Sequence, residues 1–241
     1  MQPLDDCGTT RFNYTQFQHE GFAMTDFSAA RTTMVDCQVR PSDVTKYPII
    51  DALLTVEREE FVPTAKRGIA YMGEHIDLAP GRVLLDPRTF AKMLDLANIQ
   101  PTELVLDLGC GFGYSSAVIA RMAEAVVAVE PDEQMAQEAA ELLSGSGVDN
   151  VMVEQAELTK GAPKHGPYCV IMLQGAAEQI PAEITDQLKP GGRIIAIRQS
   201  GNTGHCKIGY KHDHGIDWRN AFDATAPILP GFNKEQEFTF G

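Results

Sequence analysis

The residues with the clearest chemical potential form a glycine-rich loop, Asp107-Leu108-Gly109-Cys110-Gly111-Phe112-Gly113, that ends an apolar run. Glycines in such a loop permit a sharp turn and let a ligand approach the main chain. The dinucleotide pattern G-x-G-x-x-G is not met, because Tyr114 stands where the third glycine would be. The phosphate-loop pattern is not met either, since no lysine follows the glycines. The loop therefore predicts a ligand of another kind.

Three acids indicate what that ligand is. Asp107 lies at the start of the loop, where it would repel a pyrophosphate and attract a cationic or amine-bearing group. Glu130 ends the next apolar run, from which a carboxylate can accept hydrogen bonds from both ribose hydroxyls. Glu157, after the third run, is placed to meet an adenine amino group. An unphosphorylated nucleoside with positive groups points to S-adenosylmethionine. The alternative, in which the glycines only end a strand and Glu130 is a surface charge, is disfavoured because loop, strand order and acid spacing agree.

The elements that must position these residues alternate between short apolar runs and helical patterns. Strands are expected at 104–108, 125–130, 151–155, 168–173 and 192–198, and helices at 114–123, 132–145 and 182–188. This alternation predicts an α/β fold with a doubly wound, mostly parallel sheet covered on both faces. Residues 205–212 and 234–240 alternate apolar and polar side chains, which predicts antiparallel strands at a sheet edge. Upstream, helices are expected at 30–40, 47–59 and 88–99, around a looser stretch at 64–87.

The chain is long enough for one sizeable α/β domain with a smaller appendage, at 241 residues. We expect residues 1–23 to be a flexible extension, residues 24–87 a helical segment on the substrate side, and residues 88–241 the nucleoside-binding core. The second part opens at Met24, where the pattern becomes regular. The first 23 residues lack the layout of a signal peptide.

Composition excludes several classes of partner. The formal net charge of −13 argues against binding to nucleic acid or an anionic membrane, because both need a surplus of Lys and Arg. No apolar run is long enough for a transmembrane helix. The five cysteines are odd in number and show no C-x-x-C spacing, which favours free thiols and a cytoplasmic location.

Four segments together resemble one family of enzymes. They are "RTTMVDCQV", "REEFVPTAKRGIAY", "VLDLGCGFGYSSAVIA" and "AAEQIPAEITDQLKPGGRIIAI". The glycine loop alone is generic to class I S-adenosylmethionine-dependent methyltransferases, whereas the combination resembles the protein-L-isoaspartate O-methyltransferases. The resemblance implies a Rossmann-like seven-stranded sheet with a final antiparallel strand. It also implies S-adenosylmethionine as methyl donor, S-adenosylhomocysteine as product, and the isoaspartyl carboxylate of a damaged protein or peptide as acceptor.

The resemblance also supplies the expected donor site. The donor is expected to lie over the glycine loop, and Glu130 falls on the family's ribose-binding acid. The family's Gly-Asp-Gly turn corresponds to Ala156-Glu157-Leu158, so its acid is kept in longer form and its glycines are gone. The expected donor-binding residues are Asp107, Gly109, Cys110, Gly111, Gly113, Glu130, Pro131, Glu157 and Gln174.

The acceptor side departs from the family. A Thr-Ile-Ser-x-Pro segment, whose hydroxyls help to seat the acceptor carboxylate, corresponds here to Val83-Leu84-Leu85-Asp86-Pro87. Losing a hydroxyl that bonds a charged group costs about 1.5–3 kcal/mol, and Asp86 would repel a carboxylate. Leu85 and Asp86 are the positions matching the family's active-site segment, and Tyr71, Arg82 and Val83 are further acceptor-side candidates.

Three hypotheses follow for function. The first is an isoaspartyl methyltransferase, which needs little acid–base help because its nucleophile is already a carboxylate, so that proximity dominates. The second keeps the donor and takes a small-molecule acceptor. The third is a donor-binding protein that has lost catalysis. A monomer and a homodimer are both compatible with the sequence.

The other potentially reactive residues are expected to have structural roles. The cluster His205, Cys206, His212, Asp213 and His214 lacks the second half of a tetrahedral metal site, so we expect a solvated hairpin and no metal. Cys110 has no nearby histidine to activate it and is expected to be a small apolar filler. Trp218 and Phe222 are expected to pack the C-terminal hairpin rather than line a substrate pocket.

Overall fold

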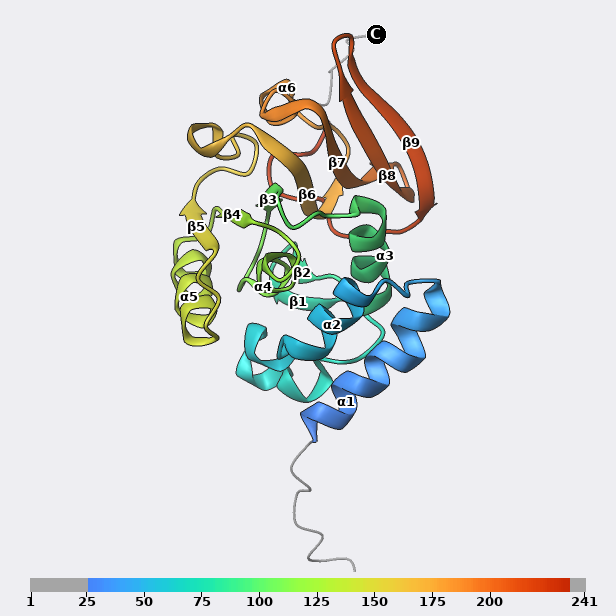
Figure 1. Ribbon diagram of the computed structural model, residues 1–241, viewed down its shortest axis with the longest axis vertical. Coiled ribbons are helices and arrows are strands. Elements are labelled where there is room, and N and C mark those ends of the chain that lie inside the picture. Colours follow the sequence, from blue (N-terminus) through green and yellow to red (C-terminus); the bar gives the residue numbers. More distant parts are fainter. Residues whose placement is uncertain (1–25, 235–241) are drawn as a thin grey trace, which may run out of the picture.

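A seven-stranded sheet forms the centre of the computed structural model, which describes residues 26–234 (Figure 1). The strands lie in the order β5-β4-β3-β6-β7-β8-β9. Neighbouring strands from β5 to β7 pair in parallel, while β7 with β8 and β8 with β9 pair antiparallel. Their bounds are β3 Leu104–Leu108, β4 Ala125–Glu130, β5 Val151–Gln155, β6 Tyr168–Ala177, β7 Leu188–Ser200, β8 Thr203–His212 and β9 Gly215–Asp223. The predicted doubly wound sheet with antiparallel C-terminal strands is confirmed, although the second of these strands, β9, covers residues to which the sequence pattern assigned no strand.

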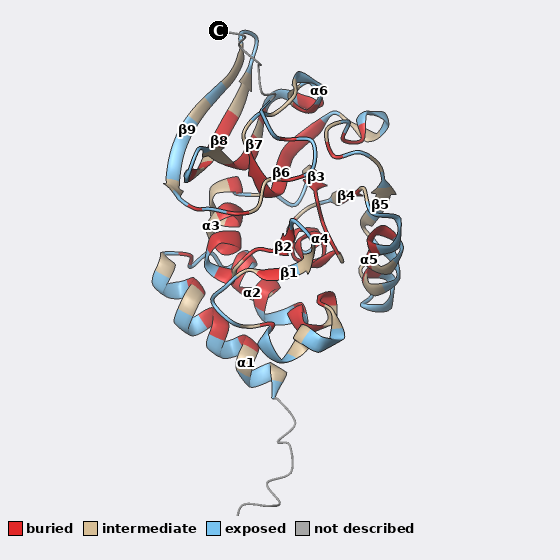
Figure 2. Ribbon diagram, turned by 180° about the vertical axis from the view of Figure 1, so that it is seen from behind, coloured by how far each residue is buried: buried red, intermediate tan, exposed pale blue. Residues whose placement is uncertain are grey.

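Apolar continuity explains which strands lie in the middle. All residues of β6 are buried, and β3 and β4 are buried except at their first residue. The outer strand β9 is mostly exposed or half-exposed, as its polar residues require (Figure 2). The central position of β3 and β4 brings their carboxyl ends, and therefore Asp107 and Glu130, to one edge of the sheet.

Helices flank the sheet and begin at identifiable caps. They are α3 Pro87–Ala97, α4 Tyr114–Ala120, α5 Glu133–Gly145 and the short α6 Ala182–Thr185. The Asp86 side chain accepts from the Thr89 N–H at the start of α3, and Asp132 accepts from Met135 at the start of α5. Asn98 ends α3 in the left-handed conformation at φ 47°. None of the described helices has the length and apolar character needed to span a membrane.

The N-terminal helices form a separate group at one end of the molecule, away from the β8–β9 hairpin (Figure 1). They are α1 Phe27–Met34, the π-helical turn η1 Val35–Val39, the 3₁₀ turn η2 Arg40–Ser42, α2 Tyr47–Thr55, and the 3₁₀ helices η3 Arg58–Phe61 and η4 Thr64–Ile69. The single helix predicted over 30–40 is therefore wrong in detail. The wider π turn brings Met34 and Val39, both buried, toward one face, where they join the core.

The stretch predicted to be loose, 64–87, contains a two-stranded hairpin that the sequence pattern did not reveal. Strand β1, Ile76–Ala79, pairs antiparallel with β2, Arg82–Leu84. The tip turns at Gly81, whose φ of 72° favours glycine. This hairpin is a separate sheet and makes no strand pairing with the main one.

The chain after β9 returns across the carboxyl end of β6. Ala176 donates to the Pro227 carbonyl, and Leu229 donates to the Ala176 carbonyl, both at 2.9 Å. A Cβ on Gly175 would lie 2.7 Å from Leu229, so glycine is required for this approach. The strand predicted at 234–240 and the extension predicted at 1–23 lie outside the described residues.

Arg58 joins the N-terminal helices to the segment that follows the hairpin. Its side chain is fully buried; Nε donates to the Ala70 carbonyl at 2.6 Å and Nη2 to the Leu85 carbonyl at 2.7 Å. The guanidinium lies 4.8 Å from the centre of the Tyr114 ring at the start of α4. Arg58 thereby fixes the exit of the hairpin against the glycine loop.

We expect Arg58→Met to lower the free energy of unfolding by about 2–4 kcal/mol, because two buried carbonyls lose their donors. Denaturant unfolding of both proteins measures the change. Arg40→Ala is the control: its ion pair with Asp36 is exposed and contributes at most about 0.5 kcal/mol. Equal stability of Arg58→Met and wild type would contradict this role.

Candidate active site

The glycine loop takes the sharp turn expected of it. Gly109 and Gly111 have φ values of 82° and 59°, in the region that favours glycine. The Gly109 N–H donates to the Val129 carbonyl of β4 at 2.9 Å, which ties the loop to the neighbouring strand. Gly113 then caps α4, and its missing side chain lets Leu143 of α5 approach. The loop thus lies at the carboxyl edge, between the ends of β3 and β4.

Asp107 is a buried carboxylate beneath this loop. The hydroxyls of Ser115 and Ser116 donate to Oδ2, and Gln174 Nε2 donates to Oδ1, each at 2.6 Å. Burial raises the pKa of Asp107; the three hydrogen bonds oppose this effect, and nearby Glu130 adds to it. The predicted donor-site residues Asp107 and Gln174 are therefore brought together.

Glu130 is the second buried carboxylate, and its partners were not expected. Arg82 donates from Nη1 to Oε1 at 2.6 Å and from Nη2 to Oε2 at 2.7 Å, across 48 residues of sequence. The backbone N–H groups of Gly111 and Asp132 also donate to the carboxylate, at 2.8 and 3.3 Å. Glu130 is fully buried and Arg82 nearly so. Arg82, predicted to lie on the acceptor side, is bound to Glu130, the acid predicted to bind the ribose.

Side chains from two distant segments fill the space above the glycines. A Cβ placed on Gly111 would lie 2.6 Å from Leu78 Cδ1, and one on Gly109 would lie 3.1 Å from Leu229 and 3.2 Å from Arg82 Nη2. The cavity left beside Gly109 and Gln174 measures about 10 Å³, which is room for at most one water molecule. The described arrangement is therefore closed over the loop.

The segment predicted to lie on the acceptor side lines this same closed space with apolar groups. Val83 and Leu85 are buried there, as are Leu84 and Phe90. The Asp86 side chain caps α3 and lies 3.4 Å from His75 Nδ1. A larger cavity of about 570 Å³ adjoins Asp86 and His75 on the side facing residues 223–225. Leu85 and Asp86 thus face different spaces.

Tyr71 is not brought to the loop. Its hydroxyl accepts from Arg31 Nε at 2.9 Å and donates to Glu59, within the N-terminal helices. The pKa of Tyr71 is raised, mainly by burial and also by the hydrogen bond to Glu59. The hydrogen bond from Arg31 opposes this by lowering the pKa. This network links α1 to η3 and accounts for the buried polar groups Arg31 and Glu59.

The remaining donor-site candidates are placed less centrally. Glu157 is exposed on the turn after β5, and Pro131 is half-buried beyond β4. Cys110 is buried in the loop, and burial raises the pKa of its thiol well above the ordinary value. The filler role expected of Cys110 agrees with this environment.

The histidine cluster lies on the β8–β9 hairpin and its turn. His205 pairs with Asp223 at 2.7 Å, and His212 and His214 both lie near Asp217, at 3.5 and 3.2 Å. Among residues 26–234, no group of three or more His, Cys, Asp or Glu side chains is arranged to hold a metal ion.

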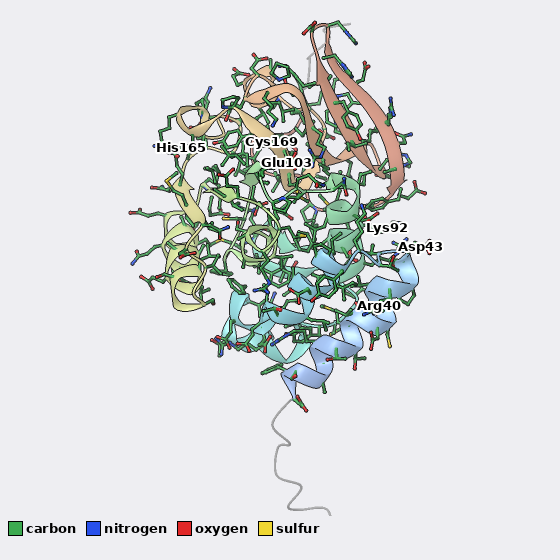
Figure 3. The ribbon with its side chains drawn as sticks, in the orientation of Figure 1. Arg40, Asp43, Lys92, Glu103, His165 and Cys169 are labelled. Carbon is green, nitrogen blue, oxygen red and sulfur yellow. The ribbon has the colours of Figure 1, made fainter. Side chains whose placement is uncertain are left out.

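The two aromatic residues of β9 pack against neighbouring cations. Lys92 of α3 faces the hairpin (Figure 3), with Nζ 4.6 Å from the centre of the Phe222 ring. Arg198 lies 5.4 Å from the centre of the Trp218 ring. Both contacts agree with the packing role expected of these residues.

The fold and this site define a class I, Rossmann-like S-adenosylmethionine-dependent methyltransferase. The family model for "Protein-L-isoaspartate(D-aspartate) O-methyltransferase (PCMT)" matches residues 31–217. The chain therefore belongs to the protein-L-isoaspartate(D-aspartate) O-methyltransferase family, which confirms the predicted family, enzyme class and methyl donor.

Relatives and solved structures agree with this assignment. A protein-L-isoaspartate O-methyltransferase of Roseiflexus castenholzii is 32% identical over 170 residues, covering 70% of this chain and 78% of the relative. One from Aeropyrum pernix is 36% identical over 173 residues, covering 70% and 66%. A Plasmodium falciparum protein described as belonging to the same family, solved with S-adenosylhomocysteine, superposes with a TM-score of 0.71 at 18% identity. It covers 84% of this chain and 97% of that one, and it supports the fold.

The residues of the site fit this donor in chemistry but leave it no room in the described arrangement. A buried carboxylate suits ribose hydroxyls, and a buried acid beneath the loop suits a cationic ligand. Both Glu130 oxygens are taken by Arg82, however, and a nucleoside-sized ligand needs a cavity of about 300 Å³ or more. A donor bound over the loop, as the sequence predicts, would therefore require the residues above the loop to move.

We expect the stability difference between Asp107→Asn and wild type to change with pH. The folded chain holds the Asp107 proton to higher pH than the unfolded chain, so wild type loses stability as pH rises through that interval. The variant does not titrate there, so its free energy of unfolding relative to wild type should rise as the pH increases above about 4, the ordinary pKa of an Asp side chain. Denaturant unfolding at each pH gives the difference. Asp149→Asn, at an exposed position, controls for the loss of one carboxylate; a constant difference for Asp107→Asn would count against the buried charge.

Proposed function

We propose that this chain methylates the isoaspartyl carboxylate of damaged proteins or peptides, with S-adenosylmethionine as donor. The observation that carries the proposal is the family match over residues 31–217, on a glycine loop flanked by two buried carboxylates. When bound, the donor supplies an electrophilic methyl group: a carboxylate oxygen attacks the methyl carbon, the carbon–sulfur bond breaks, and its electron pair stays on sulfur. The products are a methyl ester and S-adenosylhomocysteine.

The chain's own part in this reaction is binding and orientation. Glu130 would hold the ribose hydroxyls once Arg82 leaves it, and the Gly111 N–H would keep the carboxylate in place. Asp107 is held by Ser115, Ser116 and Gln174 and adds a negative charge beneath the loop. Leu85, whose carbonyl is held by Arg58, keeps an apolar surface beside the loop. Such a reaction needs positioning rather than a base.

A second candidate keeps the donor and changes the acceptor to a small molecule. It is favoured by Val83 and Leu85, which are buried and present no hydroxyl to a carboxylate. Asp86 adds a negative charge at the cavity of about 570 Å³. A cationic or amine acceptor suits that charge better than a carboxylate does.

We further propose a cytoplasmic location and a monomeric or homodimeric state. The four cysteines in the described part of the chain, Cys37, Cys110, Cys169 and Cys206, are free thiols, which suits a reducing compartment. The net charge of −13 supports a protein or small-molecule partner over nucleic acid. The N-terminal segment 24–87 would form the acceptor side, since it contains β1, β2 and the apolar wall of Val83–Leu85.

Methyl transfer to an isoaspartyl peptide, with the matched aspartyl peptide as control, tests the acceptor. We expect base-labile methyl incorporation into the isoaspartyl peptide alone, because carboxyl methyl esters hydrolyse in base and N-methyl groups do not. The double variant Val83→Thr, Leu85→Ser should raise the rate by about tenfold or more, since each restored bond to a charged group contributes about 1.5–3 kcal/mol.

Val151→Thr on the edge strand β5 controls for adding a hydroxyl elsewhere. Binding of S-adenosylhomocysteine without peptide methylation by wild type or the double variant would overturn the isoaspartyl acceptor. Base-stable methylation of amines in that case would support the second candidate.

A further inference from the structure

The hairpin β1–β2 places two side chains in the space that a donor would need. Arg82 of β2 forms a bidentate (two-pronged) ion pair with Glu130, with N–O distances of 2.6 and 2.7 Å. Leu78 of β1 lies against Gly111, so closely that a Cβ there would be 2.6 Å from it. Both side chains come from the same short hairpin, so one movement of that hairpin would clear both.

The ion pair and the donor's ribose compete for the same atoms. The Glu130 carboxylate accepts from both Arg82 nitrogens and from the Gly111 and Asp132 N–H groups. These bonds use the lone pairs that ribose hydroxyls would need. Arg82 bound to Glu130 and ribose bound to Glu130 are therefore mutually exclusive.

The hairpin is joined to the main sheet by side-chain packing and not by strand pairing. Its strands pair only with each other, so opening breaks no ladder hydrogen bond of the seven-stranded sheet. Its base is anchored: His75 Nε2 bonds the Thr225 carbonyl at 2.8 Å, and Arg58 holds the Leu85 carbonyl. The tip, residues 77–83, carries both Leu78 and Arg82. Besides the Arg82 ion pair, the tip is held by a hydrogen bond from the half-exposed Lys66, whose Nζ donates to the Asp77 carbonyl at 2.8 Å.

We propose that the β1–β2 hairpin is a lid over the donor site and that Arg82 is its latch. The proposal rests on the donor assignment made above. In the closed position Arg82 satisfies the buried charge of Glu130 and Leu78 covers the loop. Donor binding pays for opening, so the apparent dissociation constant exceeds the intrinsic one by the reciprocal of the open fraction.

Calorimetric titration with S-adenosylhomocysteine tests the latch, and this ligand is chosen because its sulfur carries no charge for Arg82 to repel. We expect Arg82→Ala to bind about tenfold tighter or more than wild type, because the closed state loses its ion pair. The same variant should unfold at a lower temperature without ligand, since Glu130 is left unpaired. Arg82→Lys, which keeps the charge but not the two-pronged bond, should fall between them.

Two further variants separate the latch from general effects. Leu78→Ala keeps the ion pair and should also tighten binding, so the proposal stays testable if Arg82→Ala fails to fold. Arg193→Ala removes a matched two-pronged pair with Glu103, at 2.7 and 2.8 Å, that lies away from the site. It should lower the unfolding temperature and leave the dissociation constant unchanged.

Hydrogen exchange gives a readout independent of affinity. On addition of S-adenosylhomocysteine to wild type, the amides of residues 76–84 should exchange faster while those of the glycine loop become protected. Equal dissociation constants for wild type, Arg82→Ala and Leu78→Ala would overturn the latch and leave the donor assignment standing. Absence of binding by every variant and by wild type would overturn the donor assignment instead.

Discussion

The buried carboxylate of Glu130 is the constraint on which the rest of this site depends. A charge with no exposure to solvent must be matched by donors, because its desolvation costs several kcal/mol. The parallel pairing of β3 and β4 puts this charge at the sheet edge, where the Gly111 and Asp132 N–H groups reach it. Those two donors leave oxygen lone pairs free, so a further donor is needed: Arg82 in the closed arrangement or, in our proposal, a ribose. The position of the hairpin follows from which one is present.

Asp107 is a second buried carboxylate, and its hydrogen-bond donors come from other parts of the fold. Two serine hydroxyls and one amide satisfy it from α4 and β6, and none of these comes from a mobile hairpin. Its charge is therefore held in the same way whether the lid is open or closed. The site thus combines Asp107, whose partners do not change, with Glu130, whose partner can be exchanged. The base of the site can then stay fixed while the hairpin above it moves.

Much of this architecture could be predicted from the sequence, because its signals are local. Apolar runs long enough to show continuity predicted the strands β3 to β7, and the glycine spacing predicted the sharp turn at the carboxyl edge of the sheet. The hairpin β1–β2 was not predicted, because strands of three and four residues are too short to show a periodic pattern. The π turn at Val35–Val39 was not predicted, because it depends on which side chains pack into the core of the finished fold.

The contacts that close the site could not be predicted, for a different reason. Arg82 meets Glu130 across 48 residues, and Leu229 meets Gly109 across a larger part of the chain. Neither pair has a local signal, since only the finished fold brings the segments together. Strand β6 also runs past the predicted end at residue 173, because Leu229 packs on Gly175 and covers the small residues that follow. Small residues without β propensity become strand when a neighbouring segment buries them.

The lid gives a physical reason for the aliphatic residues at the family's hydroxyl positions. In the closed arrangement Val83 and Leu85 are 8% and 2% exposed, inside a space that holds at most one water molecule. A hydroxyl buried there without a partner would cost about 1–3 kcal/mol, and that cost would fall on the closed state. Aliphatic side chains therefore stabilise closure at the same place where hydroxyls would help an acceptor carboxylate. The Arg82 latch and the Val83–Leu85 wall act in the same direction, so restoring hydroxyls alters two properties: it adds donors for the acceptor and it weakens the lid. The two effects have different readouts: the affinity for S-adenosylhomocysteine reports on the lid, and the rate of methyl transfer to the peptide at saturating donor reports on the acceptor.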